Sequence, residues 1–156
     1  SLFGAGADSG TFDYFTEAVN GKAKATRADF TASEDDNVLV QGSERDENSL
    51  GYIPYAYYEP HKAKMKALGI DEGKGKGCVK PSPEAVAAGT YNPLARPLFI
   101  YSTPSIIQEK PQVAGFINYY ITNVNDIIGN VGYFPASAAS LNGARLNFLA
   151  SSTPAM

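Results

Sequence analysis

The sequence predicts an α/β fold, because short apolar segments typical of strands alternate with amphipathic segments typical of helices. The first unit is the most informative: the apolar strand end Leu2-Phe3 runs through a glycine-rich turn into a helix predicted over residues 10–20. Further apolar residues at helical spacing follow near the C-terminus. With 156 residues and 44% hydrophobic content, the chain is long enough for one substantial core. We therefore expect one α/β domain followed by a helical appendage.

The elements after the first helix have weaker local signals. Residues 21–32 are predicted to form a polar loop. Ser33 is a good N-cap, and Asp36 three residues later gives nearly a capping box, so the next helix is predicted from Ser33 to Gly42. The segment 50–57 is rich in aromatic residues and predicts a strand.

Proline and glycine set the boundaries that come next. A helix is predicted over residues 59–67, beginning near a proline, and a glycine-lysine loop over residues 73–77. Ser82 and Pro83 are typical of a helix start, and Gly89 of its end.

The C-terminal third predicts one short strand and two helices. Residues 97–101 form a compact apolar segment between prolines and are predicted to be a strand. Apolar residues then recur at helical spacing in two groups: Val113, Phe116, Ile117, Tyr120, Ile121 and Val124, and later Leu141, Ala144, Phe148 and Leu149. The first group forms a continuous stripe that a folded protein must cover.

The turn before the first helix has the chemistry of an anion site. The first N–H groups of a helix have no partner within the helix, and the aligned peptide dipoles place partial positive charge there. Gly10 lets the backbone come close to a ligand, and the hydroxyls of Ser9 and Thr11 can donate hydrogen bonds. The same residues also form an ordinary capping sequence, in which Ser9 or Asp8 serves only the helix. The motif alone leaves both interpretations open.

Four blocks of sequence resemble the periplasmic phosphate-binding proteins that feed Pst-type ABC transporters. Residues 2–17 (LFGAGADSGTFDYFTE) resemble the phosphate loop of the second domain of that family. Residues 31–42, 50–58 and 79–101 agree with it in order and spacing. The resemblance covers about the C-terminal half of the sequence of a family member.

This resemblance implies a fold and a domain organisation. It implies an α/β fold with one lobe of a type II periplasmic-binding-protein clamshell, followed by C-terminal helices that return to the other lobe. Residues 1–96 would form the second, phosphate-loop lobe, residues 97–102 a hinge strand, and residues 103–156 a helical segment packing toward the first lobe. The first lobe would be supplied by a longer polypeptide or by a partner chain.

The resemblance also implies a function without catalysis and without a cofactor. The chain would bind inorganic phosphate and deliver it to the permease subunits of an ABC transporter. It would work in the periplasm or outside the cell, with or without a lipid tether. The alternative is an interaction or scaffold protein that keeps one lobe of the fold and binds another protein through its apolar helical stripe.

The resemblance assigns the phosphate contacts to Ser9, Gly10 and Thr11. In the best-known branch of the family an arginine stands four residues before the serine, where this sequence has Ala5. Arg27 could replace it, although a surface ion pair is the plainer role for that residue. Beside these, Asp8 could orient the loop or pair with an arginine, and Asn37 could donate its amide to the anion.

Composition and residue counts argue against other classes of function. A net charge of −3 argues against nucleic-acid binding, because proteins that bind nucleic acids typically carry a positive patch. Cys78 is the only cysteine, so no internal disulfide is possible, and one cysteine with one histidine cannot build a zinc site. The surroundings of Ser9 resemble those of a serine-protease nucleophile, but His61 lies among lysines on a segment expected to be exposed. The chain is therefore predicted not to be an enzyme.

Overall fold

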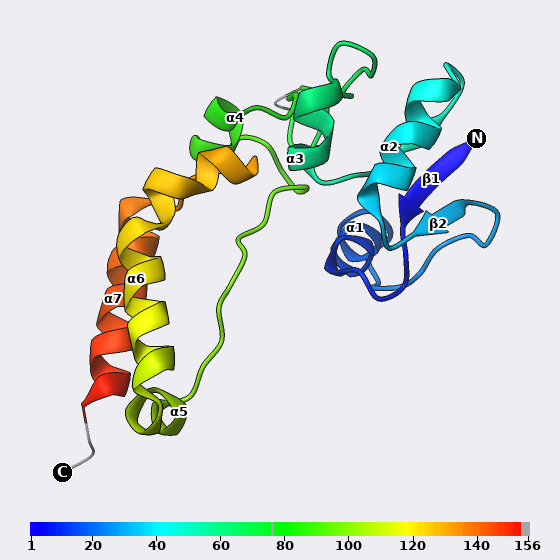
Figure 1. Ribbon diagram of the computed structural model, residues 1–156. Coiled ribbons are helices and arrows are strands. Elements are labelled where there is room, and N and C mark those ends of the chain that lie inside the picture. Colours follow the sequence, from blue (N-terminus) through cyan, green and yellow to red (C-terminus); the bar gives the residue numbers. More distant parts are fainter. Residues whose placement is uncertain (76, 154–156) are drawn as a thin grey trace. The chain divides into compact units, whose positions relative to one another are not determined.

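The computed structural model describes residues 1–75 and 77–153, and these form two units, Ser1–Ala95 and the residues from Arg96 onward (Figure 1). Lys76 of the predicted glycine-lysine loop lies outside the described residues, as do the last three residues of the predicted C-terminal segment. No helix in the described part is long and apolar enough to cross a membrane.

The N-terminal unit is built on a three-stranded parallel sheet in the order β2-β1-β3. The central strand β1 (Leu2–Ala5) pairs with β2 (Thr31–Ser33) on one side and with β3 (Leu50–Gly51) on the other. In the register, Ala5 lies beside Ser33 and Leu2 beside Leu50. Because all three strands are parallel, their carboxyl ends meet at one edge of the sheet.

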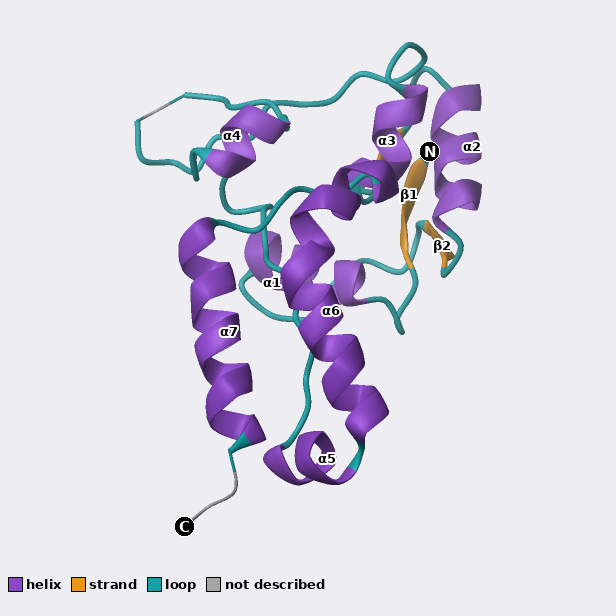
Figure 2. Ribbon diagram, turned by 60° about the vertical axis from the view of Figure 1, so that its left-hand side comes forward, coloured by secondary structure: helices purple, strands orange, loops and turns teal. Residues whose placement is uncertain are grey.

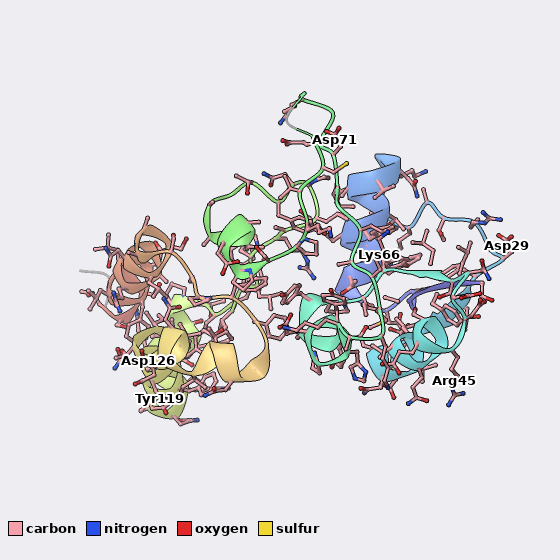
Figure 3. The ribbon with its side chains drawn as sticks, turned by 90° about the horizontal axis from the view of Figure 1, so that it is seen from above. Asp29, Arg45, Lys66, Asp71, Tyr119 and Asp126 are labelled. Carbon is pink, nitrogen blue, oxygen red and sulfur yellow. The ribbon has the colours of Figure 1, made fainter. Side chains whose placement is uncertain are left out.

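Helices connect these strands on both faces of the sheet. The helix α1 (Gly10–Asn20) follows β1, and α2 (Asp36–Arg45) follows β2. The chain moves to opposite sides of β1 in these two crossovers, so right-handed connections place α1 and α2 on opposite faces. Figure 3 shows this, with α1 in blue and α2 in cyan on either side of β1. The predicted α/β class is confirmed.

A small core lies between these helices and the sheet. Its buried residues are Ala5, Phe12, Thr16, Leu39 and Val40. Thr16 is the polar member, and its hydroxyl donates to Phe12 O at 2.8 Å and accepts the Lys24 N–H at 2.7 Å. The buried hydroxyl is therefore satisfied, and it fixes the loop that leaves α1.

The predicted helix from Ser33 to Gly42 is shifted toward the C-terminus. Ser33 is the last residue of β2, so Asp35 caps α2 instead and accepts the Asn37 N–H at 2.9 Å. Gly42 does not end the helix, which continues to Arg45. The glycine is needed in the helix interior because the ring of Phe3 packs directly against it: a Cβ at this position would lie 2.3 Å from Phe3 Cε1.

Replacing Gly42 by alanine should therefore destabilise the protein, although alanine is the better helix former. Overpacking against the Phe3 ring is expected to cost about 1–3 kcal/mol, more than the roughly 1 kcal/mol gained in helix propensity. Gly115→Ala is the matched control, because a Cβ there meets nothing within 4 Å, and it should stabilise its helix. Thermal unfolding followed by circular dichroism measures both variants, and a higher melting temperature for Gly42→Ala would contradict the packing described.

Two predicted elements in the middle of the chain are shorter than expected. The predicted strand 50–57 is shortened to β3. The Tyr52 N–H still donates to Phe3 O at 3.2 Å, but Pro54 has no N–H for the next bond to β1 and starts the short helix α3 (Tyr55–Tyr58). The predicted helix 59–67 is reduced to the 3-10 turn η1 (Glu59–His61) followed by further turns. The helix α4 (Pro83–Ala87) agrees with prediction: Ser82 caps it, and Gly89 follows it with φ +66°.

The C-terminal unit consists of helices. It contains α5 (Pro104–Glu109), α6 (Pro111–Ile127), the 3-10 turn η2 (Ile128–Val131) and α7 (Ala138–Ser152). Figure 2 shows α6 and α7 side by side, with α5 at one end and in contact with both. Both long helices were predicted from their apolar spacing, whereas the proline-initiated α5 was not.

The strand predicted over residues 97–101 is wrong for this structure. No strand forms there, and among the described residues no backbone hydrogen bond links this segment to a neighbouring strand. A strand needs such a ladder, and the apolar content that suggested it is instead exposed: Leu98 is 59%, Phe99 67% and Tyr101 87% accessible. Whether the segment acts as a hinge stays a prediction.

Candidate anion-binding site

Three loops meet at the carboxyl edge of the sheet. They are residues 6–9 between β1 and α1, residues 34–35 between β2 and α2, and residues 52–54 between β3 and α3. In the strand order β2-β1-β3, the chain adds β2 on one side of β1 and then β3 on the other side, which makes a topological switch point between β1 and β3. Open α/β sheets bind ligands at such a switch point. The glycine-rich turn therefore lies where this architecture places a site.

The turn is held in a defined conformation by backbone hydrogen bonds. Gly6 N–H donates to Ser33 O at 3.0 Å and so extends the pairing of β1 with β2. Ser9 N–H donates back to Gly6 O, also at 3.0 Å. The Ser9 side chain then accepts the Thr11 N–H at 3.1 Å and caps α1. The capping role considered in the sequence is thus present.

Capping does not use up the donors of the turn. Among the described residues, none accepts a hydrogen bond from Gly10 N–H, and Gly10 is exposed. The Ser9 hydroxyl accepts the Thr11 N–H but retains its own hydrogen to donate. The N-terminal end of the 11-residue helix α1 adds partial positive charge at this point. An anion could therefore bind here while the cap stays in place.

Carboxylates rather than cations line the next loop. Glu34, Asp35 and Asp36 follow one another at the start of α2, and burial raises the pKa of Asp36, with Asp35 and then Glu34 adding to the effect. Any anion bound beside them must be held by directed hydrogen bonds and the partial charge at the end of α1, because these carboxylates repel it.

Asp8 and Asn37 were both predicted near the site; Asp8 lies in the β1–α1 turn, and Asn37 lies in the first turn of α2. The backbone N–H of Asp8 donates to Glu34 Oε1 at 3.2 Å. The side-chain amide of Asn37 donates to Asp35 Oδ1 at 2.9 Å, so it serves the cap of α2. Asp8 is therefore linked to the β2–α2 connection, whereas the Asn37 amide is engaged locally.

The structure does not bring Arg27 to the turn. Its guanidinium makes two 2.5 Å hydrogen bonds to the carboxylate of Asp29, and both side chains are exposed. This contact lowers the pKa of Asp29. The loop carrying the pair enters β2 at the amino edge of the sheet, opposite the turn, and Figure 3 shows Asp29 at the periphery of the unit. The ion-pair role considered for Arg27 is the one observed.

Sequence reasoning missed two residues beside the turn, Glu34 and Tyr52. The Tyr52 ring stacks on Phe15 with centroids 4.0 Å apart, and its hydroxyl donates to Ala5 O at 3.3 Å. Gly4 makes room for it, since a Cβ there would lie 2.3 Å from the ring. Burial raises the pKa of Tyr52. The small residue at Gly4 was the only local signal that something large packs against β1.

His61, the one histidine, is paired away from Ser9. Its Nδ1 is hydrogen-bonded to Glu44 Oε1, and Lys64 Nζ lies 3.4 Å from Glu44 Oε2. His61 and Lys64 therefore connect α2 to the segment after α3, whereas the Ser9 hydroxyl takes part in a helix cap. This arrangement has no resemblance to a nucleophile and its base.

The Glu44 contacts predict a pH dependence of stability. The His61 hydrogen bond is the largest of the causes that hold the pKa of Glu44 below its ordinary value of 4.5. A carboxylate with a lowered folded-state pKa stabilises the protein above its ordinary pKa, and this contribution is lost as the pH falls through the folded-state pKa. Glu44→Gln should therefore lower the melting temperature above about pH 5 and have no effect at about pH 2. Glu47→Gln, at an exposed position, is the control, and a pH-independent difference for Glu44→Gln would refute the linkage.

Comparison with known proteins places this arrangement in a family of binding proteins. The model of the PBP superfamily domain matches residues 1–124, most of the chain. The chain belongs to this family, and the recognition made from its sequence blocks is confirmed.

Three individual relatives match most of the chain, and two of them carry names that refer to phosphate. The chain is 45% identical to Protein SphX of Synechocystis sp. over 95% of its own length and 44% of that protein. It is 31% identical to the phosphate-binding protein PstS of Staphylococcus haemolyticus over 84% of this chain and 40% of that one. A crystal structure of a possible phosphate binding protein from Planctomyces limnophilus matches with a TM-score of 0.78 and 40% identity, over 98% of this chain and 54% of the other. The chain thus spans less than half the length of SphX and of PstS.

Proposed function

We propose that this chain binds inorganic phosphate through the turn between β1 and α1. The observation that carries the proposal is the exposed Gly10 N–H at the N-terminus of α1, which has no acceptor among the described residues and lies at the switch point of the sheet. The relatives named for phosphate binding support the choice of anion.

The proposed contacts follow from the donors left in the turn. Gly10 donates its N–H, and the hydroxyls of Ser9 and Thr11 each donate to a phosphate oxygen. Asp8 orients the turn through its N–H contact with Glu34. Arg27 and Asn37 would take part only by exchanging Asp29 and Asp35 for the anion, so we assign them no direct contact.

The wider function we propose is phosphate uptake. The chain would act in the periplasm or outside the cell as the second lobe of a binding protein, closing with a first lobe over the anion and presenting it to an ABC transporter permease. It would perform no catalysis. Residues 1–96 would form this lobe, residues 97–102 the hinge, and residues 103–156 would pack toward the first lobe.

The surface of the C-terminal unit supports a covering partner. Only five of the 61 residues from Arg96 onward are Asp, Glu, Lys or Arg. Large apolar side chains are exposed on its helices: Phe116, Tyr119, Leu146 and Leu149 are each about 60% accessible or more. A soluble domain rarely exposes such a surface without something to bind it. The other lobe, in the same polypeptide or in a partner chain, is the occupant that the length of the relatives suggests.

The same surface favours the second candidate function, an interaction or scaffold protein that binds no anion. The two candidates differ in one measurable property. Stoichiometric anion binding supports the first, whereas stable protein association without anion binding supports the second.

Amide NMR with phosphate titrated at constant ionic strength tests the proposal, with sulfate as the comparison. This method detects the weak, millimolar binding expected of a site that lacks its second half. Saturable shifts at Gly10 and Thr11 are the expected result. If these amides do not respond up to tens of millimolar phosphate, the chain has no formed phosphate site and the interaction candidate takes precedence.

A further inference from the structure

A carboxylate lies where an anion site should least tolerate one. Glu34 Oε1 accepts the Asp8 N–H at 3.2 Å, within the turn that leads to Gly10. The contact spans 26 residues of sequence and joins the β1–α1 turn to the β2–α2 connection. Coulomb repulsion between this carboxylate and a bound phosphate would weaken binding. Its position therefore requires a role other than attraction of the ligand.

The carboxylate of Glu34 is in close contact with Gly6 of the turn. A Cβ built on Gly6 would lie 1.9 Å from Glu34 Oε1 and 2.4 Å from its carboxyl carbon. The carboxylate thus rests on the backbone of Gly6 while it accepts the N–H two residues further on. Gly6 itself donates to Ser33 O and accepts from Ser9 N–H, so the carboxylate lies over the one turn that places Ser9.

Resting on the proposed function, we infer that Glu34 is a positioning residue of the phosphate site: its carboxylate holds the turn 6–9 in the conformation that presents the Gly10 N–H and the Ser9 hydroxyl. The Asp8 N–H would otherwise have only water as a partner in the described structure. A charge-assisted hydrogen bond at this point restricts the residue that immediately precedes the cap.

Three variants separate positioning from electrostatics. Glu34→Ala removes both the acceptor and the charge. Glu34→Gln keeps an acceptor oxygen and removes only the charge. Gly6→Ala keeps Glu34 but displaces its carboxylate, and the backbone permits this because Gly6 is not among the glycines with positive φ. The clash is with the far end of a flexible side chain, so the protein can fold with Glu34 swung away.

If Glu34 positions the turn, its variants should follow an order of phosphate affinities that repulsion between Glu34 and phosphate alone cannot produce. Glu34→Gln should bind as well as the unmodified chain or better, whereas Glu34→Ala and Gly6→Ala should each bind about fivefold to tenfold more weakly. If the carboxylate only repelled phosphate, Glu34→Ala would bind more tightly. The double variant Gly6→Ala/Glu34→Ala should be no weaker than either single variant, because both break the same contact.

The experiment combines phosphate titration with amide hydrogen exchange of the full chain. Without phosphate, the Asp8 amide should exchange about tenfold faster in Glu34→Ala and Gly6→Ala, and the Glu34→Gln variant should restore most of the protection. Glu47→Ala, which removes an exposed carboxylate elsewhere, should change neither quantity. Unchanged Asp8 exchange in Glu34→Ala, or phosphate binding that this variant leaves intact, would overturn the inference alone. If the unmodified chain binds no phosphate, the proposed function fails, and the role of Glu34 in it fails as well.

Discussion

Ser9→Asp is expected to abolish phosphate binding while leaving helix α1 folded. Aspartate caps helices as well as serine does, so the bond from Thr11 N–H to the side chain at position 9 should persist. The substitution nevertheless removes a hydroxyl donor and places a negative charge within contact distance of the proposed anion. At an effective dielectric constant of about 20, two unit charges 4 Å apart repel by about 4 kcal/mol, so a loss of affinity of about a hundredfold or more is expected.

Ser9→Asn is the matched control for this prediction. Asparagine has nearly the shape of aspartate, caps a helix equally well and carries no charge. It should keep the helix content of α1 and bind phosphate within about tenfold of the unmodified chain. The measurement is the phosphate titration of both variants, with circular dichroism to verify the fold. Equal affinities for Ser9→Asp and Ser9→Asn would mean that the anion binds elsewhere.

Elements with strong local signals could be predicted from the sequence. Helix α1 begins immediately after Ser9, as its capping pattern indicates, and α4 lies between Ser82 and Gly89. The long helices α6 and α7 follow from apolar residues at helical spacing. In each case the information lies within a few residues of the boundary, where caps and periodicity act.

The errors occur where a distant residue decides the local structure. Ser33 has the chemistry of a helix cap, but pairing with Ala5 makes it the end of a strand. Gly42 has the chemistry of a helix stop, but the Phe3 ring packs against it inside the helix. The predicted strand stops at Gly51, and Ala5 O, the next acceptor on β1, accepts the hydroxyl of Tyr52 instead. None of these partners lies near enough in sequence to give a local signal.

The candidate site divides in the same way. Ser9, Gly10 and Thr11 could be proposed because a turn followed by a helix N-terminus is a local motif. Glu34 could not, since its contact with Asp8 exists only after β1 and β2 have paired. Arg27 was a candidate by charge alone, and its pairing with Asp29 shows that charge without topology is a weak guide.

Leu39→Ala is expected to give the largest loss of stability in the N-terminal unit. Leu39 is fully buried, and its helix α2 packs on both β1 and β2. Truncating a buried leucine removes its transfer free energy and leaves a cavity, at a cost of about 2–5 kcal/mol. Because the core has few members and the connection that bears Glu34 leads directly into α2, the turn 6–9 should lose order together with the core.

Val38→Ala is the control on the same helix, since Val38 is 45% exposed and alanine is a better helix former. Its effect should stay below about 1 kcal/mol. Urea unfolding followed by tyrosine fluorescence and circular dichroism measures both variants, because the chain has ten tyrosines and no tryptophan. Faster amide exchange at Asp8 in Leu39→Ala, but not in Val38→Ala, would connect the core to the candidate site. If Leu39→Ala unfolds at the same urea concentration as Val38→Ala, α2 does not pack on the sheet as described, and the contact between Glu34 and the turn loses its support.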